Sequence, residues 1–129
     1  MIPEPNAKPA RVLVVDDDRA MCQLLIDLLR EEGYAVDVAH DGESAIQKHR
    51  TAPFDLTITD LMMPKMKGIE LIQSLREIDG NAPVLLITAF GTIESAVDAM
   101  RAGAFHYVTK PFHNDEILIQ VKRALEQQR

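Results

Sequence analysis

The chain has 129 residues, a formal net charge of −6 and a single cysteine, with 47% hydrophobic and 26% charged residues. This length and composition suit one globular domain with a buried core, and one cysteine excludes an internal disulfide. The acidic balance argues against direct contact with nucleic acid, and no segment approaches the roughly 18 apolar residues of a membrane span. Because there is also no signal-peptide pattern, we expect a cytoplasmic protein in which Cys22 is a buried, reduced thiol.

The first strand and helix are marked by apolar spacing and by charge. Residues 1–10 hold three prolines and few apolar side chains, which predicts a flexible leader before a domain over residues 11–129. Residues 12–15 form an uninterrupted apolar run, typical of a strand covered on both faces, and three aspartates follow it. The next helix has Asp18 as its expected N-cap and Gly33 as its stop. Its apolar stripe consists of Met21, Leu24, Leu25, Leu28 and Leu29.

Four further strand–helix pairs follow in the same alternation. Strands are predicted over residues 34–39, 83–88 and 104–109, and in the apolar run that ends at Asp60. The second helix lies between an Asp41-Gly42 turn and Pro53 and is short and poorly amphipathic. The apolar residues of the last three helices are Ile69, Leu71, Ile72, Leu75 and Ile78, then Ile93, Ala96, Val97 and Met100, and finally Ile117, Leu118, Val121, Ala124 and Leu125.

Five strand–helix pairs in one domain predict an α/β fold. Short connections between alternating strands and helices indicate a parallel sheet with right-handed crossovers and helices on both faces. Apolar periodicity does not give the order of the strands in the sheet. A flavodoxin-like fold with strand order 2-1-3-4-5 suits five such units, and we predict it here.

Polar side chains stand at the carboxyl ends of four predicted strands. Asp16 and Asp17 follow the first strand, Asp60 follows the third, Thr88 ends the fourth and Lys110 follows the fifth. Each alone has a structural explanation, as a capping or turn aspartate, a strand residue or a solvated lysine. Because the carboxyl ends of parallel strands meet at one edge of the sheet, their joint placement favours a ligand site there.

The residue types at this edge favour phosphoryl transfer. Neighbouring carboxylates repel one another unless a cation relieves them, and an all-oxygen set suits Mg²⁺ or Mn²⁺. A zinc site is not expected, because only one cysteine is present and the histidines are scattered, at His40, His49, His106 and His113. The metal and Lys110 would neutralise phosphoryl charge, to which Thr88 could donate, and Asp60 would be the nucleophile that forms an acyl phosphate.

Over about residues 11–126, this pattern resembles the receiver domain of two-component response regulators. The resemblance implies that Asp60 accepts a phosphoryl group from the histidine of a sensor kinase. It also implies that Asp60, Asp17 and the backbone carbonyl of Met62 hold Mg²⁺. Asp16 would assist through water or at the pocket. Such a protein is a phosphorylation-activated signalling switch that catalyses only its own phosphorylation and dephosphorylation, and is not a conventional enzyme.

The resemblance also assigns the parts of the switch. Thr88 would be the switch hydroxyl, Lys110 the phosphate-binding lysine with Pro111 after a cis peptide, and Tyr107 the aromatic switch residue. Phosphorylation is then expected to draw Thr88 toward the phosphoryl group and to let Tyr107 rotate inward into the vacated space. This would change the face formed by the fourth predicted helix, the strand over residues 104–109 and the last helix. Ile119 lies opposite the buried stripe of the last helix, so it is either a harmless exposed residue or part of a partner or dimer face.

Three segments narrow the resemblance to one class. Residues 91–97, 103–105 and 110–112 resemble the nitrogen-regulation class, whose receivers control σ54-dependent transcription activators. This implies transcription regulation through an output domain or partner protein, and a phosphorylation-dependent homodimer. Met62 and Phe90 are bulky side chains two residues after Asp60 and Thr88, and neither orients an attacking water easily. We therefore predict a long-lived phosphorylated state.

Two other functions compete with a phosphorylated receiver. A haloacid-dehalogenase-type phosphatase would use Asp16 as its nucleophile, since Asp16, Asp17 and Asp18 contain an Asp-x-Asp pattern after an apolar strand. Against it, Arg19 stands where threonine or valine is usual, and Asp60 would have no role. The other alternative is an interaction module that is never phosphorylated. The complete set of acidic residues, with Thr88 and Lys110, argues against that.

Overall fold

Strands and helices alternate along the chain as the apolar pattern predicts. The computed structural model describes residues 8–63, 65–89 and 93–127. Within these ranges the strands are β1 (Arg11–Val15), β2 (Ala35–Ala39), β3 (Leu56–Thr59), β4 (Val84–Thr88) and β5 (His106–Thr109). The helices are α1 (Arg19–Glu31), α2 (Gly42–Thr51), α3 (Gly68–Ile78), α4 (Ile93–Ala102) and α5 (Asn114–Gln127). The predicted leader falls outside the described residues over 1–7, while the Ala10 carbonyl accepts a hydrogen bond from the Ala35 amide.

The strands form one parallel sheet in the order β2-β1-β3-β4-β5, which confirms the predicted flavodoxin-like topology. Val15 at the end of β1 pairs with Ala39 and Thr59, the last residues of β2 and β3. Thr88 at the end of β4 pairs in the same way with Thr109, the last residue of β5. All carboxyl ends therefore meet at one edge of the sheet, so the residues that follow them become neighbours.

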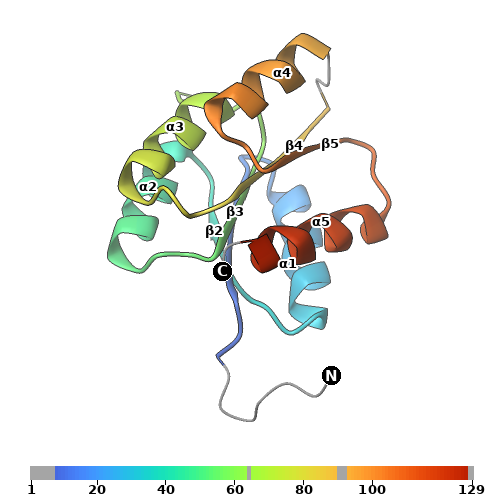
Figure 1. Ribbon diagram of the computed structural model, residues 1–129. Helices are drawn as coiled ribbons and strands as arrows, with labels where there is room; N and C mark the ends of the chain where they lie inside the picture. Colours follow the sequence, from blue (N-terminus) through green and yellow to red (C-terminus); the bar gives the residue numbers. More distant parts are fainter. Residues whose placement is uncertain (1–7, 64, 90–92, 128–129) are drawn as a thin grey trace.

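The helices cover the two faces of the sheet unequally: α1 and α5 lie on one face, and α2, α3 and α4 on the other (Figure 1). Each layer has its own apolar core. On the α1/α5 side the buried helix residues are Cys22, Leu25, Leu29, Ile117, Val121 and Ala124. On the other side they are Ala45, Leu71, Ile72, Leu75 and Ala99. β1 and β4 lie between these layers, which explains why both strands are apolar on successive residues rather than alternating with polar ones.

In two helices, the buried side chains differ from those that the apolar spacing predicts. In α1 the buried residues are Cys22, Leu25 and Leu29, while Leu24 is 44% exposed. Among residues 94–102 of α4, Ala99 is buried, and Val97 and Met100 are exposed, while the side chain of Ile93 lies outside the described part of the chain. The small side chains of Ala99 and Ala102 pack against the core of this layer, whereas the larger Val97 and Met100 do not. Apolar spacing alone therefore overestimates the burial of the larger apolar residues Leu24, Val97 and Met100.

The predicted ends of α1 and the predicted burial of Cys22 are confirmed. Asp18 is the N-cap of α1, and its carboxylate accepts hydrogen bonds from the amides of Ala20 and Met21. Gly33 follows the helix with φ +90, a conformation that favours glycine. Cys22 is buried, and burial raises the pKa of its thiol to about 11. Cys22 is therefore free and buried, as predicted.

Candidate functional site

The loop after β1 is held tightly at the carboxyl edge of the sheet. Asp16 is 3% exposed, and its amide donates to the carbonyl of Ala39 on the neighbouring strand. One carboxylate oxygen of Asp16 accepts a hydrogen bond from the Asp18 amide at 2.9 Å. Asp17 lies between these two residues and is exposed. The loop therefore places one buried and one solvent-facing carboxylate side by side.

Asp60 reaches the same edge from β3. Its amide donates to the Val15 carbonyl at 3.2 Å, which extends the β1–β3 pairing, and its Oδ1 accepts from the Met62 amide at 3.1 Å. The loop then turns back through Gly68, whose amide donates to the Leu61 carbonyl. A Cβ on Gly68 would lie 2.5 Å from the Asp60 carbonyl oxygen. Only glycine permits this approach, so Gly68 helps to fix the backbone of Asp60.

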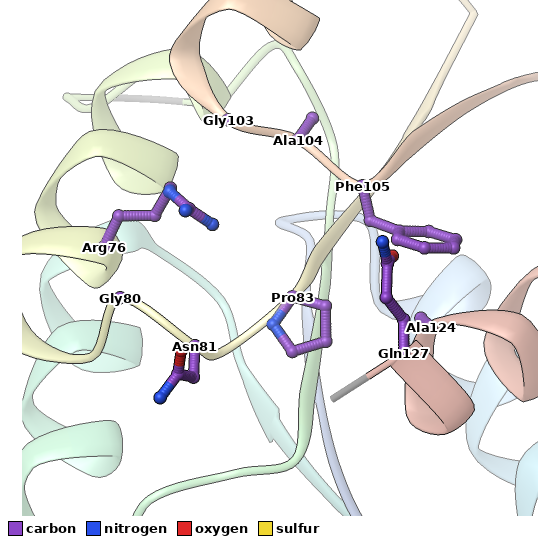
Figure 2. A pocket seen from close by; sticks show the side chains of 9 residues that line it. All are labelled: Arg76, Gly80, Asn81, Pro83, Gly103, Ala104, Phe105, Ala124 and Gln127. Atoms are coloured by element: carbon purple, nitrogen blue, oxygen red, sulfur yellow. The ribbon is translucent and has the colours of Figure 1, made fainter. Parts of the chain in front are cut away.

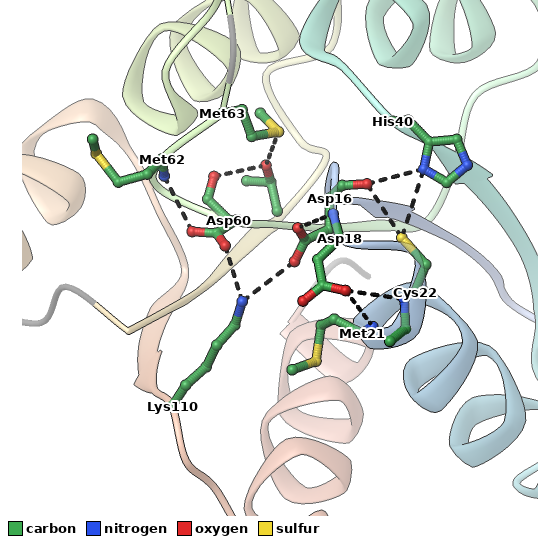
Figure 3. Close-up of polar contacts among 11 residues, drawn as sticks. Asp16, Asp18, Met21, Cys22, His40, Asp60, Met62, Met63 and Lys110 are labelled. Carbon is green, nitrogen blue, oxygen red and sulfur yellow. Dashed lines mark hydrogen bonds and ion pairs between the residues drawn. The ribbon is translucent and has the colours of Figure 1, made fainter.

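Lys110 links two of the aspartates. Its Nζ lies 2.9 Å from Oδ2 of Asp60 and 3.4 Å from Oδ2 of Asp16 (Figure 3). The Lys110 amide donates to the carbonyl of Thr88, a residue that is fully buried at the end of β4. The peptide bond between Lys110 and Pro111 is cis, as the resemblance implies. The structure thus brings together Asp16, Asp60, Thr88 and Lys110 from four strand ends.

Burial and neighbouring charges shift the pKa values of Asp16 and Lys110. Burial raises the pKa of Asp16, and the nearby charge of Asp60 raises it further, against the hydrogen bond from Asp18 and the charge of Lys110. Burial alone would lower the pKa of Lys110. The hydrogen bond to Asp60 and the charges of Asp16 and Asp60 outweigh burial, so the pKa of Lys110 lies above its ordinary value. The edge therefore holds an ammonium that is firmly charged and a carboxylate that is costly to ionise.

A divalent cation fits the donor set at this edge. The available groups are carboxylate and backbone carbonyl oxygens, the ligands that Mg²⁺ prefers. In the part of the chain that the structure describes, no three histidine, cysteine, aspartate or glutamate side chains are gathered as a metal site. Mg²⁺ does not need such a cage, because it commonly keeps several waters and takes only one or two protein carboxylates.

Met62, Tyr107 and Ile119 lie around this centre. Met62 is 48% exposed beside Asp60, and Tyr107 is half-buried, with its hydroxyl 3.3 Å from Oγ of Ser95 in α4. Ile119 is 50% exposed, which confirms the predicted exposure, and it lines a hollow of about 280 Å³ with Tyr107 and Glu116. The role of Ile119 in an interface remains a prediction. Phe90 lies outside the described residues.

His40 is a residue at this edge whose position the sequence analysis missed. The scattered positions of the histidines in the sequence do not single it out, but His40 directly follows β2, and its Nδ1 lies 3.0 Å from the Asp16 carbonyl oxygen. The signal was present, because His40 stands at the end of a predicted strand like the other site residues. Cys22 also lies against Asp16.

A further hollow lies elsewhere in the described structure. It has a volume of about 380 Å³ and is lined by Arg76 near the end of α3, by the loops that enter β4 and β5, which contain Pro83 and Phe105, and by Gln127 at the end of α5 (Figure 2). These loops lie at the amino ends of the strands, the edge of the sheet opposite Asp60. This hollow contains none of the predicted site residues.

The identity of the domain follows from comparison with known proteins. Residues 12–122 match the model of the response regulator receiver domain. The protein belongs to this family. A receiver is not a conventional enzyme, so the phosphatase alternative is set aside. The match covers the strand ends that carry Asp16, Asp17, Asp60, Thr88 and Lys110.

Relatives support the narrower class as well. The receiver is 39% identical over 114 residues to the transcriptional regulatory protein ZraR of Klebsiella oxytoca, a match that covers 88% of this chain and 26% of ZraR. It is 36% identical to the regulatory protein AtoC of Escherichia coli (strain K12) over 92% of this chain and 26% of AtoC. The chain therefore spans about a quarter of these regulators.

A solved structure completes the comparison. The beryllofluoride-activated NtrC4 receiver domain dimer superposes with a TM-score of 0.88 and 34% identity, covering 92% of this chain and 98% of that chain. With ZraR and AtoC, it confirms the predicted resemblance to receivers of the nitrogen-regulation class. Across the described ranges, no helix combines the length and the apolar character that a membrane crossing requires.

Proposed function

We propose that this receiver is a phosphorylation-activated switch whose phosphoacceptor is Asp60. The observation that carries the proposal is the pairing of Lys110 Nζ with Asp60 Oδ2 at 2.9 Å, at the edge where β3, β4 and β5 end. An ammonium there can neutralise the charge of an incoming phosphoryl group while the Asp60 carboxylate attacks it. Thr88 ends β4 at the same edge and would be the hydroxyl that donates to the phosphoryl group.

Mg²⁺ would share the neutralisation of charge with Lys110. We assign its protein ligands as Asp60, Asp17 and the backbone carbonyl of Met62, with Asp16 assisting. When bound, the ion supplies a Lewis-acid charge that stabilises the phosphoryl oxygens. The buried Asp16 is compatible with this assignment, since burial and the charge of Asp60 raise its pKa and a cation at this edge would favour its ionised form.

The phosphoryl donor would be the phosphohistidine of a sensor kinase, the partner that the family implies. In this reaction the phosphorus–nitrogen bond breaks and a phosphorus–oxygen bond to Asp60 forms. We place the receiver in the cytoplasm, as residues 11–129 after a leader of residues 1–10. The lone, buried thiol and the acidic composition are consistent with that location.

The signal would leave the domain through α4, β5 and α5. Tyr107 on β5 is already hydrogen-bonded to Ser95 on α4, so rotation of its ring would change the contact between these elements. Ile119 on α5 and Val97 and Met100 on α4 are exposed apolar side chains near this region. We propose that they form a phosphorylation-dependent homodimer face or meet an output domain that controls transcription.

Treatment with acetyl phosphate and Mg²⁺ tests the phosphoacceptor. The wild-type protein should gain the mass of one phosphoryl group, and Asp60→Asn should gain none. Asp27→Asn is the matched control, because Asp27 is an exposed carboxylate on α1 that should not affect uptake. A wild-type protein that takes no phosphate from acetyl phosphate or from any kinase would instead support the interaction-module alternative. Uptake by Asp60→Asn would show that the acceptor is another residue.

Sedimentation of the phosphorylated protein tests the proposed dimer face. Ile119→Lys should weaken self-association at least about tenfold, because a charge would replace an apolar contact at the interface. Leu24→Lys is the control, since Leu24 is similarly exposed but lies on α1. Equal self-association of wild type and Ile119→Lys would remove Ile119 from the interface.

A further inference from the structure

One backbone oxygen beside the proposed cation site accepts two side-chain hydrogen bonds. The carbonyl oxygen of Asp16 lies 3.0 Å from Nδ1 of His40 and 3.3 Å from Sγ of Cys22 (Figure 3). His40 comes from the end of β2, and Cys22 comes from the first turns of α1. Two elements on either side of the β1–α1 loop therefore hold the same peptide group.

The roles of the His40 ring nitrogens follow from their partners. A carbonyl oxygen can only accept, so the hydrogen of the ring lies on Nδ1. Nε2 then carries the lone pair, and it lies 3.4 Å from a guanidinium nitrogen of Arg19, which can only donate. The ring is thus held at both nitrogens, and its Nδ1–H is aimed at Asp16.

This carbonyl belongs to the peptide bond that joins Asp16 to Asp17. Because a peptide group is planar, holding its oxygen also sets the direction in which Asp17 leaves Asp16. The Asp16 amide is already fixed by Ala39, and the Asp18 amide by the Asp16 carboxylate. The hydrogen bonds from His40 and Cys22 therefore restrict rotation of the Asp16–Asp17 peptide plane, which the other contacts do not hold.

We propose that His40 is a positioning residue for the cation site: its Nδ1–H holds the Asp16–Asp17 peptide so that the carboxylates meet Mg²⁺ in the correct geometry. This inference rests on the proposed Mg²⁺-dependent function. Groups that orient metal ligands without touching the metal commonly change metal affinity by about 10–100-fold. Cys22 contributes less than His40, because a thiol is a weak donor.

Three substitutions of His40 distinguish the effect of the Nδ1–H donor from the effect of the size of the ring. The side-chain amide of His40→Asn can place a donor near the Nδ1 position, that of His40→Gln reaches the Nε2 position, and His40→Phe keeps the ring without a donor. His113→Asn is the control, since His113 is an exposed histidine outside this contact. Binding of Mg²⁺ is measured without a phosphodonor, from the amide shifts of the β1–α1 and β3–α3 loops in an NMR titration. Unfolding by urea in EDTA is measured in parallel.

The expected result is a selective loss of Mg²⁺ affinity. His40→Phe and His40→Gln should bind Mg²⁺ about tenfold more weakly, while His40→Asn and His113→Asn keep the wild-type Kd. Unchanged Kd in His40→Phe, or equal losses in the Asn and Gln variants, would overturn the inference, even where urea shows lower stability. Should His40→Phe fail to fold, the comparison of Asn with Gln decides in the same way. A wild-type protein that takes no phosphate would contradict the proposed function instead.

Discussion

The Nζ of Lys110 lies 2.9 Å from Oδ2 of Asp60, although 50 residues separate them in the chain. The same ammonium lies 3.4 Å from Asp16, so one cation serves two carboxylates. Before phosphorylation it offsets the repulsion between them. A phosphoryl group on Asp60 would compete for this ammonium and release Asp16 from it. The resting ion pair would therefore be part of the proposed switch as well as of the fold.

Removal of this ammonium should destabilise the metal-free protein. Lys110→Met leaves Asp16 and Asp60 facing each other, and we expect a loss of about 2 kcal/mol in the free energy of unfolding at pH 7. This is below the about 3–5 kcal/mol typical of a fully buried pair, because these side chains keep some solvent contact. Urea unfolding in EDTA measures it. Lys122→Met, at an exposed position on α5, should change stability by less than about 0.5 kcal/mol. Equal stability of Lys110→Met and wild type would contradict the ion-pair account.

Asp16 should lower stability at neutral pH. Its pKa is raised in the folded state, so the folded protein holds this proton at pH values where the unfolded chain has lost it. The pKa of Asp16 is 3.8 in the unfolded chain and higher in the folded protein. As the pH rises above 3.8, ionisation of Asp16 therefore begins to lower the free energy of unfolding, and the loss is complete once the pH exceeds the folded pKa. Asp16→Asn should be more stable than wild type by about 1 kcal/mol at pH 7.

The pH dependence supplies the check on Asp16. In EDTA the advantage of Asp16→Asn should shrink steadily as the pH is lowered from 7 toward 4, and urea unfolding at several pH values measures this. The same substitution should weaken phosphorylation by acetyl phosphate and Mg²⁺. An advantage of Asp16→Asn that does not change with pH would point to packing rather than to charge.

Gly68 should be intolerant of any side chain. A Cβ there would lie 2.5 Å from the Asp60 carbonyl oxygen and 2.9 Å from the Leu61 Cα, both backbone atoms that cannot move aside cheaply. We expect Gly68→Ala to lose about 3 kcal/mol or more of stability, at the upper end of overpacking effects. It should also slow phosphorylation, because the Asp60 backbone must shift. Gly80→Ala is the control, since its nearest atom lies 3.8 Å away, and it should be nearly neutral in thermal unfolding.

Cys22 should be unreactive in the folded protein. Burial raises the pKa of its thiol to about 11, so at pH 8 only about one molecule in a thousand carries the thiolate that alkylating reagents attack. Iodoacetamide labelling followed by mass measurement should be slow in buffer and fast in urea. Labelling at the same rate in both solvents would show that the thiol is accessible.

The phosphorylated state should be long-lived. Met62 is exposed beside Asp60 and has a thioether that neither donates a hydrogen bond nor orients a water for attack on the acyl phosphate. We expect Met62→Asn to shorten the half-life by about tenfold, less than the effect of a positioned general base. Decay is followed in Mg²⁺ after removal of acetyl phosphate, with Met100→Asn as the control at an exposed methionine on α4. Rapid decay of the wild-type phosphoprotein would contradict this prediction.

Much of the site was predictable from two features. Apolar runs mark where each strand ends, and parallel pairing brings those ends together. Asp16, Asp60, Thr88 and Lys110 each follow or end an apolar run, and a parallel sheet brings all such ends to one edge. The cis peptide before Pro111 was implied by the resemblance and is present. The fold class, the edge of the sheet and the candidate phosphoacceptor could therefore be inferred from the residues alone.

Only the tertiary structure decided how neighbouring elements meet at that edge. It pairs Lys110 with two aspartates, aims His40 at the Asp16 carbonyl and turns Leu24 to solvent. It also presses Gly68 against the Asp60 backbone. Apolar periodicity describes one element at a time. These contacts instead depend on the rotation of each helix and on the distances between loops from different elements, which packing of the whole core sets.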